Sequence, residues 1–549
     1  MPKSTQYLKD SIRMATSPGF RSRLLEKGEA RKLVWRDKGP NEDGPNFDPL
    51  LSYDLLSYGY SILGCGLELE ETEGRSPLVV AAFESAAKAI ESALTETTGS
   101  TQRDQFHRTL SAAAFHLAGF SARSYSVVNA VNASHMESIE TRCLTLLITR
   151  DLNKLNSYIT SVRSDPNVSD TYLASQLEAK AKSEDPTNFD ACILDIVDQA
   201  LTDTFLGAIS AGMLAFERGD QELFDSAMIR LETGMEGASK LEMVDQWWLH
   251  KMASRLMRGL WESSIHNALP VIAPEGCYPE EWRTLRQAFV ASLFKRQRAE
   301  IDLWPSQLEA VSKAVDTREN IVLSLPTSAG KTRVAEVCIL RTLAERKRVV
   351  FITPLRSLSA QTEATLRRTF APLGKLVSSL YGAIGLASFD ASILEAYDIV
   401  VATPEKLDFA LRTNPHILDN VGLIVFDEGH MIGESEREVR YEVQIQRLLR
   451  RNDAELRRIV CISAVLPQEN RAEDFINWIT RDNPQGLVYS AWRPTDLRFG
   501  EVKFENSVGR LEITVGSEHP FVPKFITPIV PSRGRRRNAF PKDNDRGEL

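Results

Sequence analysis

The chain has 549 residues, of which 43% are hydrophobic and 26% are charged, and its formal net charge is −8. This length accommodates three or four domains, and the composition indicates a packed globular protein. The negative net charge excludes a basic field over the whole molecule, so any contact with nucleic acid must be local.

The six cysteines lie far apart without CxxC spacing, which argues against a zinc site or disulfide framework and favours a reducing cytoplasm. No apolar run approaches the ~18 residues that a membrane span needs, so we expect no membrane association. The basic N-terminus lacks a following apolar segment, which argues against a secretory signal. A transit peptide is the alternative, although Asp10 and Glu26 interrupt the basic stretch.

Residues 1–50 form a polar N-terminal segment, in which the stretch 39–46 is expected to be irregular because it is rich in glycine, proline and asparagine. Residues 51–299 are predicted to form a helical domain. One of its helices opens with Ser76 as N-cap and Pro77 at the first helical position. Its apolar residues recur at three- and four-residue steps, which places them on one face: Phe83, Ala87, Ile90 and Leu94.

Similar periodicity predicts helices over 104–130, 193–218 and 221–234, and a further helix that carries three tryptophans. Small residues are dense in this region and allow helices to approach closely. Stacked tetratricopeptide-like hairpins and an irregular bundle both fit, because we find no strict repeat period. The pair Trp247 and Trp248 is interpreted as core rather than as a platform for stacking bases.

From residue 300 the pattern changes, because short runs rich in valine and isoleucine alternate with helical stretches. These runs are nearly continuous in apolar residues, as parallel strands buried on both faces require. Residues 300–495 are therefore predicted to form a doubly wound α/β domain. The predicted strands cover residues 320–325, 348–353, 377–381, 398–403, 422–426, 458–463 and 487–489.

The last part of the chain has a different amino-acid pattern. Residues 496–530 are predicted to be a linker with β segments, and residues 531–549 to be a disordered basic and polar tail. The cluster from Arg535 to Arg537 is interpreted as a solvated basic cluster within that tail.

The most informative string runs from Leu325 to Thr332 and reads Leu-Pro-Thr-Ser-Ala-Gly-Lys-Thr, after a predicted strand and before a predicted helix. In that context backbone N–H groups wrap phosphate oxygens, and the helix N-terminus adds its dipole. Lys331 would reach the β- and γ-phosphates, and Thr332 would coordinate magnesium. The loop residues expected to cradle ATP are Thr327, Ser328, Ala329 and Gly330. The string departs from the general P-loop pattern, because Leu325 stands where that pattern has its first glycine.

A second motif follows a hydrophobic strand and reads Asp427-Glu428-Gly429-His430. A carboxylate at the end of a buried strand is unfavourable unless a cation meets it, and a magnesium ion bound to ATP would do so. Asp427 is therefore expected to hold the metal, and Glu428 to orient and deprotonate the attacking water. His430 is the type of residue that couples the state of ATP to the next motif.

These motifs resemble the first RecA-like motor domain of DExH-type, Ski-like superfamily 2 helicases, over about residues 300–500. Further segments match that family in order and spacing. The resemblance implies that Gln307 reads adenine, that Ser463 and Ala464 belong to the coupling motif, and that a strand-end edge binds single-stranded DNA or RNA. The residues expected along this edge are Thr353, Pro354, Arg356, Gln361, Gly382, Thr403, Pro404 and Glu405. Val465 departs from the family pattern, because it replaces a threonine.

Helicases of this family bind ATP between two RecA-like domains, and residues after 500 show no second one. We therefore expect the chain to need a second RecA-like half, or a partner subunit, in trans. The helical first half before this motor resembles the layout of helicases of bacterial antiphage defence systems, of the Hachiman type. The prediction is the N-terminal part of an ATP-dependent helicase or translocase that binds ATP and Mg²⁺. The alternative is a non-catalytic module that senses nucleotide and binds a partner.

Overall fold

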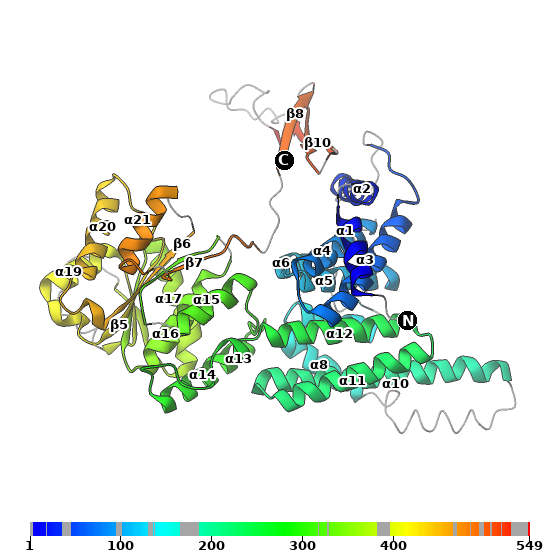
Figure 1. Cartoon of the computed structure of the whole chain (residues 1–549), viewed down its shortest axis with the longest axis horizontal. Coiled ribbons are helices and arrows are strands. Elements are labelled where there is room, and N and C mark those ends of the chain that lie inside the picture. The colour runs from blue at the N-terminus through cyan, green and yellow to red at the C-terminus, as the bar shows by residue number, and fades with distance from the viewer. Residues whose placement is uncertain are drawn as a thin grey trace, which may run out of the picture. The chain divides into compact units, whose positions relative to one another are not determined.

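The computed structural model (Figure 1) describes the chain in segments. These are residues 4–17, 19–35, 45–94, 101–129, 136, 138–164, 186–316, 318–326, 329–380, 396–464, 469–483, 485–493, 499–505, 508–515, 517, 519–528 and 547–548. The chain divides into two compact units. The first unit comprises Met1–Gly207, Ile229–Leu256 and Pro494–Leu549, and the second comprises Ala208–Met228 and Met257–Arg493.

The helical part of the chain contains long antiparallel helices. Its helices are α1 (Thr5–Thr16), α2 (Phe20–Trp35), α3 (Leu51–Glu73), α4 (Pro77–Ala93), α5 (Gln102–Leu117), α6 (Ser121–Asn129), α7 (Ile139–Ile148), α8 (Leu152–Arg163), α10 (Pro186–Arg218), α11 (Gln221–Lys240) and α12 (Val244–Glu262).

Helix α4 begins as its sequence predicts, because the Ser76 hydroxyl accepts a hydrogen bond from the Val79 amide at 3.3 Å and Pro77 occupies the first turn. Helix α3 packs closely against α4. A Cβ atom built on Gly59 would lie only 2.7 Å from the side chain of Ile90. Small residues therefore allow the close helix contacts that the sequence indicates.

One expectation for this region needs correction. The helix predicted over 104–130 is two helices, α5 and α6, because Gly119 adopts a φ of +90° and the Phe120 amide bonds back to the Phe115 carbonyl at 2.9 Å. This is the glycine-terminated helix end that stops a helix without steric cost. The polar segment 1–50 also contains two helices. Helix α1 buries the side chains of Leu8, Ile12 and Ala15.

The tryptophans of α12 differ in their surroundings. Trp261 is buried and stacks on Phe224, with ring centroids 4.6 Å apart. Trp247 and Trp248 are half-buried and contact each other edge to face, and Trp248 also contacts Tyr60. The interpretation of the pair Trp247 and Trp248 as core therefore holds in part.

The segment after residue 496 forms a small antiparallel sheet with strand order β11-β10-β9-β8. Its strands are β8 (Gly500–Glu505), β9 (Val508–Ile513), β10 (Phe521–Pro528) and β11 (Gly547–Glu548). Of the predicted disordered tail, 531–549, residues 547–548 form β11, and the others, Arg535–Arg537 among them, lie outside the described residues.

The second unit contains a seven-stranded, fully parallel sheet with strand order β3-β4-β2-β5-β6-β1-β7. All seven predicted strands are present: β1 (Ile321–Ser324), β2 (Arg348–Ile352), β3 (Val377–Ser379), β4 (Ile399–Ala402), β5 (Val421–Phe426), β6 (Arg458–Ser463) and β7 (Leu487–Tyr489). The predicted α/β class with a parallel, RecA-like sheet and a large helical region is confirmed.

Helices cover both faces of this sheet (Figure 1). One face packs against α14 (Pro279–Phe294), α15 (Pro305–Asp316), α16 (Lys331–Ala344) and α17 (Arg356–Phe370), near α13 (Ile265–Ala268). The other face packs against α19 (Pro404–Thr413), α20 (Glu436–Leu449) and α21 (Glu469–Thr480).

Adjacent residues of β5 illustrate why the strands are continuously apolar. Leu423 and Val425 are buried in the first layer, and Ile424 and Phe426 are buried in the second.

None of the helices among the described residues is long and apolar enough to cross a membrane.

The two-sided burial of β5 makes a testable prediction. Leu423→Ala and Ile424→Ala should each lower the free energy of unfolding of this sheet by about 2–5 kcal/mol, because each opens a cavity in a different layer. Urea-dependent hydrogen exchange of the sheet amides in the full chain measures this loss. Leu376→Ala, at an exposed leucine, is the control and should change it little. A loss at only one of the two β5 positions would contradict two-sided burial.

Candidate nucleotide site and strand-end edge

The phosphate loop lies where β1 ends and α16 begins. Gly330 precedes the first residue of α16 and adopts a φ of +74°, a conformation that favours glycine. A Cβ atom at this position would also overlap the side chain of Gln307. Ala329 is buried, Lys331 is half-buried at the helix start, and Thr332 is exposed. Thr327 and Ser328 lie outside the described residues.

Gln307 contacts this loop directly. Its amide oxygen accepts a hydrogen bond from the Trp304 backbone N–H at 2.8 Å, and its amide nitrogen donates to the Gly330 carbonyl at 2.9 Å. The buried Gln307 amide therefore ties the start of α15 to the phosphate loop. The predicted contact with adenine would use an amide that already has two protein partners here.

Asp427 and Glu428 follow the carboxyl end of β5. The Asp427 amide donates to the Ile352 carbonyl at 2.9 Å, and the Tyr441 hydroxyl donates to the Asp427 carbonyl at 2.9 Å. Sequence reasoning missed Tyr441, which fixes the backbone from the neighbouring helix α20.

The electrostatics of this pair are those of a site built for a cation. Burial raises the pKa of Asp427 to about 6, and the Glu428 carboxylate adds to this rise, whereas Lys331 opposes it. Burial also lowers the pKa of Lys331, while Glu428 and Asp427 act in the opposite direction. Lys331 and the two carboxylates are thus close enough to influence one another, although they come from strands that are not neighbours.

The next residues connect this pair to β6. Glu428 adopts a φ of +50°, and its carboxylate lies 3.4 Å from Nδ1 of His430. The same His430 nitrogen lies 3.2 Å from the hydroxyl of the fully buried Ser463. Gly429 donates its amide to the Ile462 carbonyl at 2.8 Å, and a Cβ atom there would overlap the sulfur of Cys461. The turn therefore holds Glu428, His430 and Ser463 in one chain of contacts.

The predicted strand-end edge lies at the carboxyl ends of β2 and β4, next to β5. The Thr353 hydroxyl is buried against the Ser359 hydroxyl, so it holds the turn between β2 and α17. Thr403 and Pro404 are buried at the start of α19, and Glu405 is exposed. Gln361 is exposed on α17, whereas Ala464, which follows β6, is half-buried.

Three further residues singled out in the sequence lie wholly or partly outside the described part of the chain. Gly382 and Val465 lie outside the described residues, and of Arg356 only the backbone, at the start of α17, is described. The structure therefore brings together the described residues of the predicted ATP site, from Gln307 to Ser463. It does not place Gly382, the glycine of the predicted strand-end edge.

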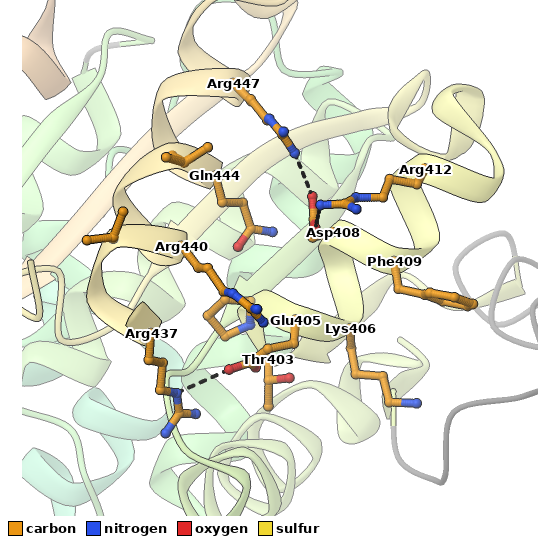
Figure 2. Close-up of a pocket in the computed structure, with 13 residues that line it drawn as sticks. Thr403, Glu405, Lys406, Asp408, Phe409, Arg412, Arg437, Arg440, Gln444 and Arg447 are labelled. Carbon is orange, nitrogen blue, oxygen red and sulfur yellow. Dashed lines mark hydrogen bonds and ion pairs between the residues drawn. The ribbon is translucent and has the colours of Figure 1, made fainter. Parts of the chain in front are cut away.

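Arg437 of α20 joins the two halves of this edge, and sequence reasoning missed it. Its guanidinium donates to the Pro354 carbonyl and pairs with Glu405 at 3.1 Å. Beside it, a groove of about 700 Å³ opens between α19 and α20 (Figure 2). Its lining is mainly basic and apolar, and consists of Thr403, Pro404, Glu405, Lys406, Asp408, Phe409, Arg412, Arg437, Val439, Arg440, Val443, Gln444 and Arg447. The signal that could have revealed this α19–α20 groove is the spacing of Arg437, Arg440, Gln444 and Arg447, which places them on one face of a helix.

Comparison with known proteins agrees with this geometry. Residues 304–473 match the family of DEAD/DEAH box helicases. Hachiman protein HamB of Bacillus cereus is 25% identical over 537 residues, which cover 95% of this chain and 44% of that protein. ATP-dependent DNA helicase Hel308 of Thermococcus kodakarensis is 32% identical over 208 residues, or 37% of this chain and 17% of the relative.

Among solved structures, the DUF1998 helicase MrfA bound to DNA is 22% identical, with a TM-score of 0.30, and the match covers 40% of this chain and 30% of that one. The chain spans less than half the length of the curated relatives named above. The family match covers strands β1 to β6 of the sheet, the phosphate loop and the Asp427–His430 turn. Residues 304–473 of this chain therefore match a DEAD/DEAH box helicase domain, and the chain is similar to Hachiman protein HamB over nearly its whole length.

Proposed function

We propose that this chain is the ATP-binding part of an ATP-dependent helicase or translocase that acts on single-stranded nucleic acid in antiphage defence. The observation that carries the proposal is the convergence of Lys331 with Asp427 and Glu428 at the carboxyl edge of one parallel sheet. The similarity to Hachiman protein HamB along 95% of the chain supports the biological setting.

The residues present fit a magnesium–nucleotide complex. Ionised Asp427 is unfavourable in its buried position, as its raised pKa shows, and a bound cation would remove that penalty. Asp427 and Thr332 would hold Mg²⁺, which when bound supplies positive charge against the phosphate oxygens. Lys331 would neutralise the terminal phosphates, and the loop that ends at Gly330 would present its backbone N–H groups to them.

The remaining roles follow from the contacts of Glu428. This carboxylate would orient the attacking water and accept its proton. His430 lies between Glu428 and Ser463, so a shift of Glu428 on nucleotide binding would reach the end of β6 through two side-chain contacts. The strand-end edge, including Pro354 and Thr403, would hold the sugar–phosphate backbone without reading bases.

The first prediction from this proposal concerns Lys331. Lys331→Ala should weaken Mg²⁺–ATP binding by about 10–100-fold, because it removes a charge-assisted contact to phosphate. Titration of the full chain with a fluorescent ATP analogue measures this affinity. Lys375→Ala is the matched control, because Lys375 precedes β3 at the opposite edge of the sheet. Equal affinities of the two variants would contradict the proposed phosphate loop.

The second prediction concerns turnover. The described residues form one RecA-like sheet, so we propose that a second RecA-like half, in trans, supplies the charges opposite the nucleotide. The chain tested alone should then hydrolyse ATP about 10³–10⁵-fold more slowly than with that half, because that half would supply an arginine finger. Steady-state hydrolysis with and without single-stranded nucleic acid measures this, beside a duplex-unwinding assay. Robust unwinding by this chain alone would refute the requirement. ATP binding that no nucleic acid or second half converts into hydrolysis would favour the non-catalytic sensing module.

The third prediction concerns the pH dependence of folding without nucleotide or metal. The pKa of Asp427 is about 6, above its ordinary value of 3.8, so the folded state binds this proton more tightly than the unfolded state. Stability should therefore fall as the pH rises from about 4 to about 6. Asp427→Asn removes this loss and should raise the free energy of unfolding by about 1–2 kcal/mol near pH 7.5, with a smaller gain near pH 5.

Thermal unfolding at both pH values tests this expectation. Asp474→Asn, at an exposed position on α21, is the control and should show no such difference. A gain for Asp427→Asn that is the same at both pH values would contradict the buried-carboxylate explanation.

The Asp427→Asn variant should also bind Mg²⁺–ATP more weakly than the wild type, because it loses the charge that would hold the metal.

A further inference from the structure

The α19–α20 groove adjoins the strand-end edge, because Thr403, Pro404 and Glu405 are among its lining residues. From there it follows α20, whose residues 437–447 span roughly 15 Å at the helical rise of 1.5 Å per residue. The groove therefore continues, away from the nucleotide site, a path that starts at the residues proposed to hold a nucleic-acid strand.

The groove is strongly basic in a chain that is acidic overall. Five cationic and two anionic side chains line it, which leaves three positive charges in excess, against a net charge of −8 for the whole chain. Asp408 pairs with Arg412 at 2.6 Å and with Arg447 at 3.0 Å, so one carboxylate serves two guanidinium groups. A polyanion is the complementary ligand for such a surface.

Gln444 gives a second, independent sign of a ligand. It is 3% exposed and lines the groove, and neither its amide oxygen nor its amide nitrogen has a hydrogen-bond partner within the described part of the chain. Buried polar atoms without partners are unfavourable, and natural proteins rarely keep them without a reason. Figure 2 shows this side chain on α20, directed toward the space between the two helices. An amide offers one acceptor and two donors, which matches the edge of a nucleobase better than a bare phosphate.

Apolar groups complete the lining. Phe409 is 38% exposed at the α19 side, and Val439 and Val443 are partly exposed on α20. An exposed aromatic ring among cationic side chains is the arrangement that holds single strands, because any base can stack on it.

We infer that the α19–α20 groove binds a stretch of single-stranded nucleic acid that extends the strand-end edge. Arg440 and Arg447 contact its phosphates, Phe409 stacks on a base, and Gln444 hydrogen-bonds a base edge. This inference rests on the proposed function, because the same strand must first bind at Thr403 and Pro404. An acidic protein segment would also match the arginines, but it would use neither the aromatic ring nor the continuity with the edge.

The length of the strand tests this inference. Fluorescence anisotropy of the full chain is measured with labelled oligothymidylate and oligouridylate of about 5 and about 16 nucleotides, at several salt concentrations. Arg440→Gln combined with Arg447→Gln should weaken binding of the longer strands about tenfold and reduce the salt slope by about 1.4, or about 0.7 for each phosphate of a single strand that no longer meets an arginine. The short strands, which fit on the edge alone, should bind the variant as they bind the wild type.

The matched control is Arg283→Gln. Arg283 on α14 is 75% exposed and pairs with Glu280 on its own helix, as the 69% exposed Arg440 pairs with Glu436. It lies on a helix that packs on the other face of the sheet, so its replacement should leave binding of both lengths unchanged.

Gln444→Leu separates binding from folding. This change removes two unsatisfied buried atoms, so the melting temperature should stay equal or rise, while affinity for the longer strands falls about tenfold. Gln446→Leu is the contrast, because the Gln446 amide oxygen accepts a hydrogen bond from Trp478 and its removal should lower the melting temperature. Phe409→Ala should weaken binding of the longer strands, and Phe409→Tyr should restore it, because tyrosine keeps the ring.

The outcomes separate the two proposals. If the wild type binds neither strand length, the proposed function fails together with this inference. If the wild type binds both lengths and the groove variants behave like Arg283→Gln, only the inference is overturned. The inference is also overturned if the groove variants keep strand affinity but no longer bind an oligoglutamate peptide, because the groove then takes an acidic protein segment.

Discussion

The burial of β5 on both faces of a parallel sheet is the constraint on which the site depends. Its alternating side chains fill two separate helix layers, so the strand cannot shift by one residue without exposing one of them. Because this register is fixed, Asp427 and Glu428 lie at the carboxyl edge of the sheet. Lys331, which follows β1 and the phosphate loop, lies beside them there. The charges of the site are therefore held in position by the apolar packing of β5.

The unfavourable free energy of holding the site in its folded conformation is concentrated in a few residues. Asp427 is held in an environment that disfavours its ionised form, and Glu428 is held at a positive φ. Gly429 permits this turn, because its amide bonds to Ile462 where any side chain would overlap Cys461. Strain and desolvation of this kind are typical of functional sites, because a ligand can relieve them.

One helix links the parts of the domain that the proposed mechanism needs to move together. Tyr441 of α20 bonds the Asp427 carbonyl, and Arg437 of the same helix bonds the Pro354 carbonyl and pairs with Glu405. Gln444, one turn further along, faces the α19–α20 groove. Helix α20 thus contacts the carboxylate turn, the strand-end edge and the groove through successive turns of one face.

The sequence by itself determined the α/β class, the seven strands and the two chemical motifs, because apolar runs and short motifs are local properties of the chain. It did not determine that Gln307 bonds Gly330, that α5 and α6 are separate helices, or that α1 and α2 form. It also missed Arg437 and Gln444, whose roles depend on which helix lies beside α20. Such contacts join residues far apart in sequence, and only the packing of the layers decides which side chains find partners and which remain unsatisfied.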